Sequence, residues 1–229
     1  MIPALTAFSP AAVATLGTIT DNASGATYCP DTNSIFVVRN SNSYIYEYST
    51  AGAYLRTITT SGFSDVEGIC WMSGSQFALS EEGLATICLV DITSATTSLT
   101  RAGATIIDTG LGPLANLGLE GITYDPANEC FYAVKEKSPF AVYQIELDGT
   151  TTALFDAPAL LPVTFTDLAD CYYDPESRHL ILLTQEGKRL ARVTLAGAVV
   201  EESTIPSTMN QPEGIAFSPN GRTFWLVGE

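Results

Sequence analysis

Six glutamates stand at two recurring positions of the sequence, where together they could bind a metal ion. Three begin an E-G-I phrase and three lie near the end of the apolar segment that follows it: Glu67, Glu120 and Glu213, and Glu81, Glu136 and Glu229. Two carboxylates about 4 Å apart repel each other by about 4 kcal/mol at an effective dielectric constant of about 20. Ca²⁺ relieves such repulsion because it accepts about six to eight oxygen ligands from carboxylates, amides and carbonyls. The pattern therefore predicts a Ca²⁺ site formed by these six glutamates.

Other arrangements of the same glutamates are compatible with the sequence. Each carboxylate could accept hydrogen bonds from loop amides and only brace a turn. Some of the glutamates could keep their protons through raised pKa values, or Lys135 and Lys137 could fold in as counter-charges. The sequence alone leaves these alternatives open.

A repeat along the chain positions these residues. Five phrases correspond to one another: SGATYCP at 24–30, VEGICWM at 66–72, LEGITYDP at 119–126, LADCYYDP at 168–175 and PEGIAFSP at 212–219. When Gly25, Gly68, Gly121, Asp170 and Gly214 are aligned as one column, the steps between them are 43, 53, 49 and 44 residues. Such a period is typical of the blades of a β-propeller.

Each phrase is followed by a second apolar segment, at 34–40, 76–82, 130–137, 179–186 and 223–229. We therefore predict an all-β, five-bladed β-propeller with four-stranded blades, forming a single domain over residues 1–229. The last blade has only two segments before the chain ends, and residues 5–19 match residues 46–58 in rhythm. We expect these N-terminal strands to complete the last blade, which would remove exposed sheet edges. An open stack or two sandwiches would not explain the complementary ends.

The propeller topology predicts that the glutamates gather at one mouth of the central channel. The first strand of each blade lines the channel and the second runs antiparallel to it, so the start of one and the end of the other share a face. The first position reads Ser24, Glu67, Glu120, Ala169 and Glu213, and the second reads Asn40, Glu81, Glu136, Gln185 and Glu229. The predicted mouth is therefore acidic, with two amide side chains among the carboxylates.

Composition excludes some classes of function. The chain has 25 acidic and 10 basic residues, a formal net charge of -15, which repels nucleic acid and anionic membrane surfaces. We therefore expect no nucleic-acid partner. No segment resembles a membrane span or a signal peptide, so the sequence as given predicts a soluble protein, cytoplasmic or on a virion, or periplasmic if the chain is a truncated piece.

The cysteines and the histidine argue against two common kinds of site. The five cysteines are odd in number and show no C-x-x-C spacing, so we interpret them as buried thiols. His179 is the only histidine, which leaves neither a Ser-His-Asp triad nor a histidine-bound zinc. Each predicted first strand also carries an aromatic residue, interpreted as packing between blades: Tyr28, Trp71, Tyr124, Tyr173 and Phe217.

The phrases at 65–71, 118–147, 167–193 and 211–229 resemble the SdiA-regulated family of bacterial propellers, which is distantly related to NHL-repeat propellers. This resemblance implies a five-bladed propeller with a calcium site and no established enzymatic activity. It also implies that the six glutamates match the acidic mouth of the family, although blades one and four depart from the acidic pattern. Family members usually carry an N-terminal membrane anchor and a periplasmic propeller.

Two functions follow as hypotheses. The first is a non-enzymatic, calcium-binding interaction module that recognises a protein or carbohydrate partner at its mouth or rim; a place on a cell-envelope or virion surface is one version of it. The alternative is a calcium-dependent hydrolase, similar to the lactonases and esterases built on six-bladed propellers, with Glu120 or Glu136 as general base. The predominance of glutamate at the mouth favours the first hypothesis.

Overall fold

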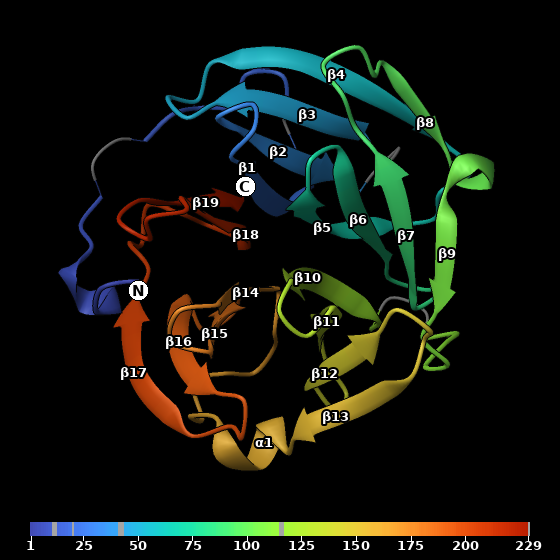
Figure 1. Cartoon of the computed structure of the whole chain (residues 1–229). Helices are drawn as coiled ribbons and strands as arrows, with labels where there is room; N and C mark the ends of the chain where they lie inside the picture. The colour runs from blue at the N-terminus through green and yellow to red at the C-terminus, as the bar shows by residue number, and fades with distance from the viewer. Residues whose placement is uncertain (11–12, 20, 41–43, 115–116, 229) are drawn as a thin grey trace.

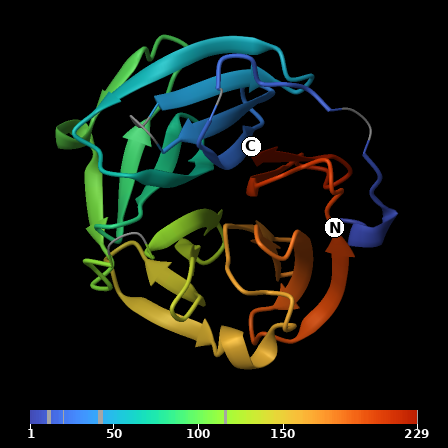
Figure 2. The same cartoon turned by 180° about the vertical axis from the view of Figure 1, so that it is seen from behind.

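The chain forms an all-β propeller around a central axis, seen along that axis in Figure 1 and from behind in Figure 2. This computed structural model describes residues 1–229 except 11–12, 20, 41–43, 115–116 and 229. Among the described residues, four sheets are complete blades, and a fifth sector holds a two-stranded sheet. No described helix is long and apolar enough to cross a membrane.

The strands of each blade follow one another from the centre to the outside. Blade 1 contains β1 (Ala23–Cys29), β2 (Ser34–Arg39), β3 (Tyr44–Ser49) and β4 (Tyr54–Ser61). Blade 2 contains β5 (Val66–Ser73), β6 (Gln76–Glu81), β7 (Thr86–Asp91) and β9 (Thr105–Asp108). Blade 3 contains β10 (Leu119–Asp125), β11 (Cys130–Lys135), β12 (Ala141–Glu146) and β13 (Thr151–Phe155). Blade 4 contains β14 (Asp170–Asp174), β15 (His179–Thr184), β16 (Arg189–Thr194) and β17 (Val199–Thr204), and the fifth sheet contains β18 (Pro212–Phe217) and β19 (Phe224–Gly228).

The remaining elements connect or extend the blades. Strand β8 (Ser98–Thr100), on the connection between β7 and β9 of blade 2, pairs in parallel with β4 and extends blade 1 to five strands. Three short helices lie outside the sheets: η1 (Leu5–Ala7), η2 (Arg101–Gly103) and α1 (Ala157–Leu160). Because β8 crosses to the neighbouring blade, backbone hydrogen bonds join blades 1 and 2 at the periphery.

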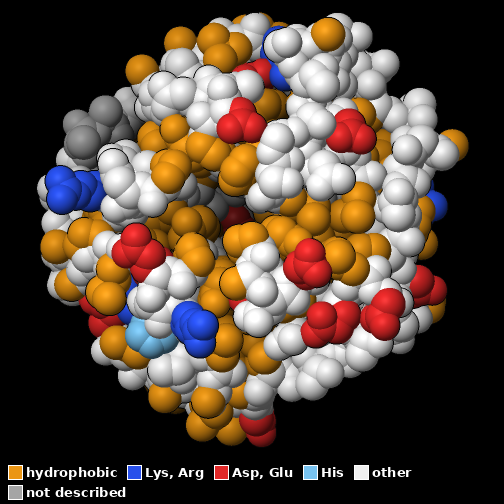
Figure 3. All heavy atoms as spheres, in the orientation of Figure 1, with side chains coloured by type: hydrophobic (Ala, Val, Ile, Leu, Met, Phe, Trp, Pro, Cys, Tyr) orange, Lys and Arg blue, Asp and Glu red, His pale blue; other side chains and the backbone are white. Residues whose placement is uncertain are grey.

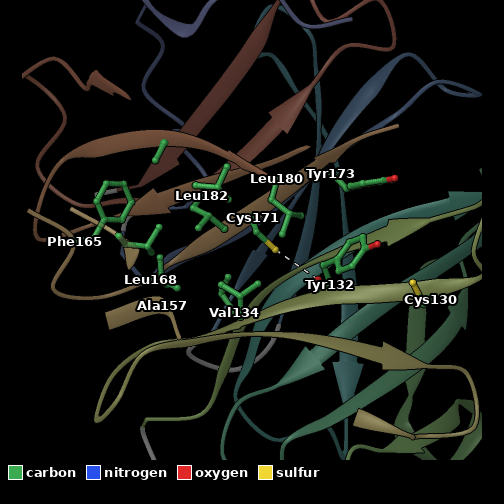
Figure 4. Close-up of a cluster of buried hydrophobic side chains, with 14 residues drawn as sticks. Cys130, Tyr132, Val134, Ala157, Phe165, Leu168, Cys171, Tyr173, Leu180 and Leu182 are labelled. Carbon is green, nitrogen blue, oxygen red and sulfur yellow. Dashed lines mark hydrogen bonds between the residues drawn. The ribbon is translucent and has the colours of Figure 1, made fainter. Parts of the chain in front are cut away.

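Packing between blades explains why the second strands are continuous apolar runs. All six residues of β11 are buried, whereas the outer strand β13 is half-buried or exposed. A strand covered by neighbours on both faces has no solvent-facing side and so loses the alternation of a surface strand. Figure 4 shows the cluster between blades 3 and 4, where Tyr132 and Val134 lie near Cys171 and Leu182. All five cysteines are free and buried, which confirms the prediction made from their number and spacing.

The first strands of the blades approach each other closely around the axis. A Cβ atom at Gly25 would lie 2.6 Å from the carbonyl oxygen of Glu67, and one at Gly68 would lie 2.5 Å from that of Glu120. The repeated glycine is therefore required by contact between adjacent blades, since any side chain there would overlap the next strand. The pairing register shifts beside this glycine in β1, β5, β10 and β18, which is typical of a β-bulge.

Asp170 occupies the glycine position of blade 4, and its side chain ties several blades together. Its Oδ1 accepts a hydrogen bond from the amide of Cys171 at 2.8 Å, and its Oδ2 accepts one from the amide of Ile215 at 2.7 Å. Burial raises the pKa of this carboxyl well above its usual value, although the backbone donors partly oppose the shift. The carboxyl lies directly beside Gly121, so its oxygens take the space that a fifth glycine would leave open.

The prediction that N-terminal strands complete a fifth four-stranded blade is wrong for the described residues. Over the described part of the chain four blades are complete, not five, and β18 and β19 form a sheet of two strands. Instead of pairing as strands, the N-terminus is held by side chains: Arg192 donates to the carbonyl oxygens of Ile2 and Pro3, and Glu201 accepts from the amide of Leu5. Ile2 and Leu5 then fill an apolar cluster between blade 4 and the fifth sheet.

The sequence gives a physical reason for this difference. Pro3 and Pro10 cannot donate to a strand ladder, and the surrounding Ala, Ser and Gly residues have little preference for strands. The rhythm of residues 5–19 therefore matched that of a hairpin, although Pro10 interrupts its series of backbone donors.

Replacing a glycine of the inner column is expected to destabilise the ring. Gly68→Ala should lower the free energy of unfolding by about 2 kcal/mol, because the added methyl group would overlap the backbone of blade 3. Gly17→Ala is the matched control, since nothing lies within 4 Å of a Cβ atom there, and it should change stability by less than about 0.5 kcal/mol. Urea unfolding of the two variants measures the difference, and equal stabilities would contradict the role assigned to the column.

Candidate functional site

An acidic cavity of about 210 Å³ opens where the first strands of the blades begin. Its lining comes from all five sheets and their adjoining loops: Ser24, Asn40, Glu67, Glu82, Glu120, Glu136, Asp167, Ala169, Gln185 and Glu213. None of these described residues is a histidine or a cysteine, so the side chains offer oxygen and amide groups only. We call this cavity the acidic mouth.

The first predicted position is confirmed as part of the acidic mouth. Glu67, Glu120 and Glu213 each precede the inner glycine of their strand, at the start of β5, β10 and β18. The shift of register beside that glycine disturbs the regular alternation of side chains, and the glutamate at the shift lines the channel mouth. The same shift of register therefore places one carboxylate from each of three sheets in a single cavity.

The second predicted position is correct in three blades and displaced by one residue in blade 2. Asn40, Glu136 and Gln185 line the mouth, and each follows the last residue of its second strand. In blade 2 the residue after β6 is Glu82, not Glu81. The backbone confirms this alignment, because the amides of Asn40, Glu82 and Glu136 donate to the equivalent carbonyls of Asn22, Asp65 and Gly118.

Glu81 is therefore not a mouth residue, which corrects the prediction. It is fully buried, and its carboxylate accepts hydrogen bonds from Arg101 Nε at 2.9 and 3.0 Å, from the Ser64 amide at 2.8 Å and from Thr86 Oγ1 at 2.6 Å. These donors hold the pKa of Glu81 below its usual value even though burial alone would raise it. Glu81 is the last residue of its strand, as Arg39 and Lys135 are of theirs, and Glu82 follows it.

Besides Glu82, two acids of the mouth region were not predicted from the sequence. Asp65 and Asp167 stand two residues before the first predicted position in blades 2 and 4. The Asp167 carboxylate accepts hydrogen bonds from Thr184 Oγ1 and from the amides of Gln185 and Glu186. The recurrence of an aspartate two residues before that position could have been seen in the sequence and would have indicated these two acids. Glu229, the sixth predicted ligand, lies outside the described residues.

Carboxylate oxygens come close together on one side of the acidic mouth. Ligand atoms of Asp65, Glu67 and Glu82 all lie within 4.8 Å of one another, and so do those of Glu82, Glu120 and Glu136. We call these the first and second carboxylate triads. They share Glu82, so a group between them would meet acids from blades 2 and 3.

Burial and mutual repulsion raise the pKa values of Glu67, Glu82 and Glu120. The pKa of Glu82 is raised to about 7, first by burial and then by the neighbouring carboxyls of Asp65 and Glu67, while a hydrogen bond from the Gly118 amide opposes the rise. The pKa of Glu120 also lies well above its usual value, first through burial and then through repulsion by Glu67, Glu82 and other mouth acids. Free of any cation, the acidic mouth therefore holds protons that exposed glutamates would have released.

The lysines neutralise only part of this charge. Lys137 Nζ lies 2.9 Å from Glu136 Oε1 and 2.8 Å from Glu186 Oε1 at the edge of the mouth. Lys135 instead donates to the carbonyl oxygens of Lys137 and Pro139, so it orders a loop and pairs with no mouth acid among the described residues. The expectation of two lysine counter-charges is thus met by Lys137 and not by Lys135.

Some mouth side chains already brace one another. Ser24 Oγ donates to Glu67 Oε2 at 2.6 Å, Asn40 Nδ2 donates to Glu67 Oε1 at 2.9 Å, and Gln185 Nε2 donates to Glu213 Oε1 at 3.0 Å. Glu67 and Glu213 therefore accept hydrogen bonds, as the bracing alternative expected, but from side chains and not from loop amides. In contrast, Asn40 Oδ1 is buried and accepts no hydrogen bond from any described residue. This buried oxygen therefore lacks a hydrogen-bond donor, and it lies in a cavity lined by carboxylates.

The oxygen atoms that line the acidic mouth fit a hard divalent cation. Carboxylate oxygens from two blades, with the uncompensated amide oxygen of Asn40 from a third, form the set that Ca²⁺ prefers, and no softer ligand competes among the described lining residues. His179, at the start of β15, lies at the opposite end of its blade.

Comparisons with known proteins bear on both the fold and the family. A family model described as SdiA-regulated matches residues 9–229. Among solved structures, the chain is similar to a chain of the crystal structure of a nidogen/laminin complex, with 15% sequence identity and a TM-score of 0.60. That match covers 90% of this chain and 72% of the other. At such low identity the likeness supports the propeller fold alone.

Two adjacent glutamates should respond oppositely to neutralisation. Glu81→Gln is expected to lower the free energy of unfolding by about 2 kcal/mol, because it weakens hydrogen bonds to a buried charge. Glu82→Gln is expected to stabilise the metal-free protein at pH 8, because it removes a charge that the neighbouring acids repel. Urea unfolding in the presence of chelator measures both effects.

The pH dependence provides the control for this pair. A raised pKa means that the folded state binds the proton more tightly, so the associated stability is present below the ordinary value of 4.5 and is lost as pH rises toward 7. Glu82→Gln should therefore reduce the loss of stability between pH 5 and pH 8. Should Glu82→Gln leave that loss unchanged, repulsion at Glu82 would not be a determinant of stability.

Proposed function

This chain belongs to the SdiA-regulated family, and from that premise we propose that it is a non-enzymatic, calcium-binding β-propeller that acts as an interaction module. The observation that carries the calcium part is the pair of carboxylate triads that share Glu82 beside the unpaired oxygen of Asn40. Repulsion among these acids leaves the mouth with a deficit of positive charge that a divalent ion would remove.

The residues that would hold Ca²⁺ come from three blades. Glu82 would be the central ligand, Glu120 and Glu136 would contribute from blade 3, and Asn40 Oδ1 would contribute from blade 1. Bound there, Ca²⁺ supplies positive charge that stabilises the ionised carboxylates. Because its ligands belong to separate sheets, it would also cross-link blades that otherwise meet only through packing and a few inter-blade hydrogen bonds.

The rigidity of the ring supports the interaction part of the proposal. Its blades present many loops at both ends of the channel, and loops on a rigid scaffold are where recognition residues usually lie. The fold by itself hosts many functions, so the kind of partner, protein or carbohydrate, must be argued from a particular surface. A place on a cell-envelope or virion surface stays a prediction from the sequence.

Calcium should stabilise the folded protein through the acidic mouth. At a concentration about 100 times the dissociation constant, a ligand that binds only the folded state adds about 2.7 kcal/mol of stability. For a chain of this size, that corresponds to a rise in Tm of about 5–10 °C. Differential scanning calorimetry with millimolar Ca²⁺ and with excess chelator measures it.

The controls for this experiment keep the charge change constant. The double variant Glu82→Gln, Glu120→Gln should lose the Ca²⁺-dependent rise, whereas Glu129→Gln, Glu176→Gln removes two exposed acids elsewhere and should keep it. An equal rise in both double variants would place any bound calcium outside the acidic mouth and reject the proposed site.

A calcium-dependent hydrolase is the second candidate, and the pKa of Glu82 favours it. A carboxylate with a pKa near 7 is suited to act as general base at neutral pH, and Glu82 reaches that range. Glu120 would be the other candidate, while Glu136 is paired with Lys137 and is less available for proton transfer. The sequence alone suggested Glu120 or Glu136 as the general base. Glu82 comes first here because the structure places Glu82, and not Glu81, in the acidic mouth.

Assays with a panel of lactones and carboxylic esters, with Ca²⁺ and with chelator, separate the two candidates. The interaction module should give no turnover above the uncatalysed rate. Calcium-dependent turnover that Glu82→Gln abolishes and Glu129→Gln retains would instead establish the hydrolase.

A further inference from the structure

A second cavity, of about 280 Å³, opens at the other end of the channel, where the first strands end. Figure 3 shows this face, with the central hollow surrounded mainly by hydrophobic side chains. The walls come from all five sheets, and their most prominent side chains are Tyr28, Trp71, Met72, Tyr124, Tyr172 and Phe217. We call this cavity the apolar mouth.

The aromatic walls are held in place by neighbouring rings. Tyr28 stacks on Trp225 with ring centroids 5.5 Å apart, and Tyr172 packs against Phe217 at 4.6 Å. These contacts agree with the packing role predicted from the sequence. Tyr28, Trp71, Tyr124 and Tyr172 are nevertheless only half-buried, so part of each ring remains available to a ligand. A preformed aromatic surface binds with little loss of conformational freedom.

Three polar side chains near the apolar mouth already have partners. Thr27 Oγ1 accepts a hydrogen bond from the Trp71 amide at 3.0 Å, and Thr123 Oγ1 accepts one from the Tyr173 amide at 3.1 Å. Asp174 accepts from Ser177 Oγ at 2.7 Å and lies 3.8 Å from an Arg192 nitrogen. Because these acceptors have partners, the part of a ligand that enters the cavity gains most from apolar contact and not from charge.

The surroundings of the cavity carry the opposite character. On the turns that join first and second strands, Asp31, Glu129 and Glu176 are exposed, against the two basic residues Arg178 and Arg222. The outer turns on the same face add two further exposed acids, Asp91 and Asp148. Acidic side chains are visible around the hollow in Figure 3. Glu176 pairs with the terminal ammonium of Met1, so a ligand cation would first meet Asp31 and Glu129.

Size and charge together limit what this face can accept. A volume of about 280 Å³ lies just below the range of roughly 300–1,000 Å³ that is usual for small-molecule sites. It suits one large apolar side chain of a partner, the kind of anchor that dominates many protein interfaces. The acidic surroundings favour basic residues beside that anchor, since complementary charges steer association and fix orientation.

We propose that the apolar mouth binds a basic peptide segment of a partner protein, with one aromatic or large aliphatic side chain inserted among Trp71, Met72 and Tyr124. Lysine or arginine residues flanking the inserted side chain lie against the exposed acids around the cavity. This inference rests on the interaction-module part of the proposed function and is independent of the metal, because the two mouths lie at opposite ends of the inner strands.

The wild-type protein tests this directly through its methionines. The chain has three, Met1, Met72 and Met209, of which Met1 and Met72 line the apolar mouth and Met209 does not. With ¹³C-methyl-methionine labelling, titration with the peptide acetyl-Lys-Arg-Trp-Arg-Lys-amide should shift the Met72 signal in a saturable way and leave Met209 unchanged. A titration that leaves the Met72 signal unmoved, or shifts Met209 equally, would overturn the proposal.

Two altered peptides separate the roles of the anchor and of the charges. Replacing Trp by Ser, or the four basic residues by Asp and Glu, should each weaken binding at least ten-fold, and added salt should weaken binding of the original peptide. Equal affinity for the acidic peptide would reject the charge argument, and equal affinity for the Ser peptide would reject the inserted anchor.

A variant pair locates the binding within the cavity. Met72→Arg, which adds bulk and positive charge to the wall, should weaken binding of the labelled peptide at least ten-fold in fluorescence anisotropy, whereas Met72→Leu should preserve it. Full affinity in a folded Met72→Arg variant would show that the peptide binds elsewhere. If that variant fails to fold, the methyl signals of the wild-type protein determine whether the peptide binds at Met72.

The peptide titration is repeated with Ca²⁺ and with chelator, and the two affinities should be the same. Failed peptide binding together with a retained calcium effect would reject this inference and leave the proposed calcium site standing.

Discussion

The close approach of the innermost strands is the constraint on which the rest of the structure depends. At four of the five inner positions the strands come so near that only glycine fits, and at the fifth the buried Asp170 accepts hydrogen bonds from an amide of its own strand and from one of the neighbouring strand β18. This contact fixes the radius of the ring and thereby the angle at which successive blades pack. The large inter-blade clusters, such as the one around Tyr132 and Cys171, can be filled without voids only at that angle. The two-stranded fifth sheet keeps its place because its inner strand satisfies the same contact, and the N-terminus fills the remaining apolar space through Ile2 and Leu5.

The same constraint creates the electrostatic character of the acidic mouth. Each inner strand changes register beside its glycine, and the residue before that glycine then lines the channel. When that residue is glutamate in neighbouring blades, the carboxylates are buried close to one another, and burial first and then their mutual repulsion raise the pKa of Glu120. A flexible loop would disperse these charges into solvent. A rigid ring cannot, and this makes a protonated or cation-bound state of the mouth the physical expectation.

The two ends of the channel differ because the residue types at the two ends of the inner strands differ. Acids and amides stand at the strand starts, while aromatic residues stand near the strand ends. Asp170 lies between them, with its carboxyl filling the space beside Gly121. The chemistry of each mouth can therefore be tested separately, and neither proposal requires a molecule to pass along the axis.

The sequence by itself determined the repeat, the identity of the first and second strands and the acidity of one mouth, because each depends on local features that recur at a fixed spacing. The glycines, the apolar second strands and the E-G-I glutamates are of this kind. Only the tertiary structure decided that Glu82 faces the mouth while Glu81 pairs with Arg101, since consecutive residues of a strand point in opposite directions and one step of alignment exchanges them. It also decided that residues 5–10 pack by side chains and not as strands, because whether a terminal segment pairs depends on which donors and apolar gaps the neighbouring sheets leave, and no local pattern records these.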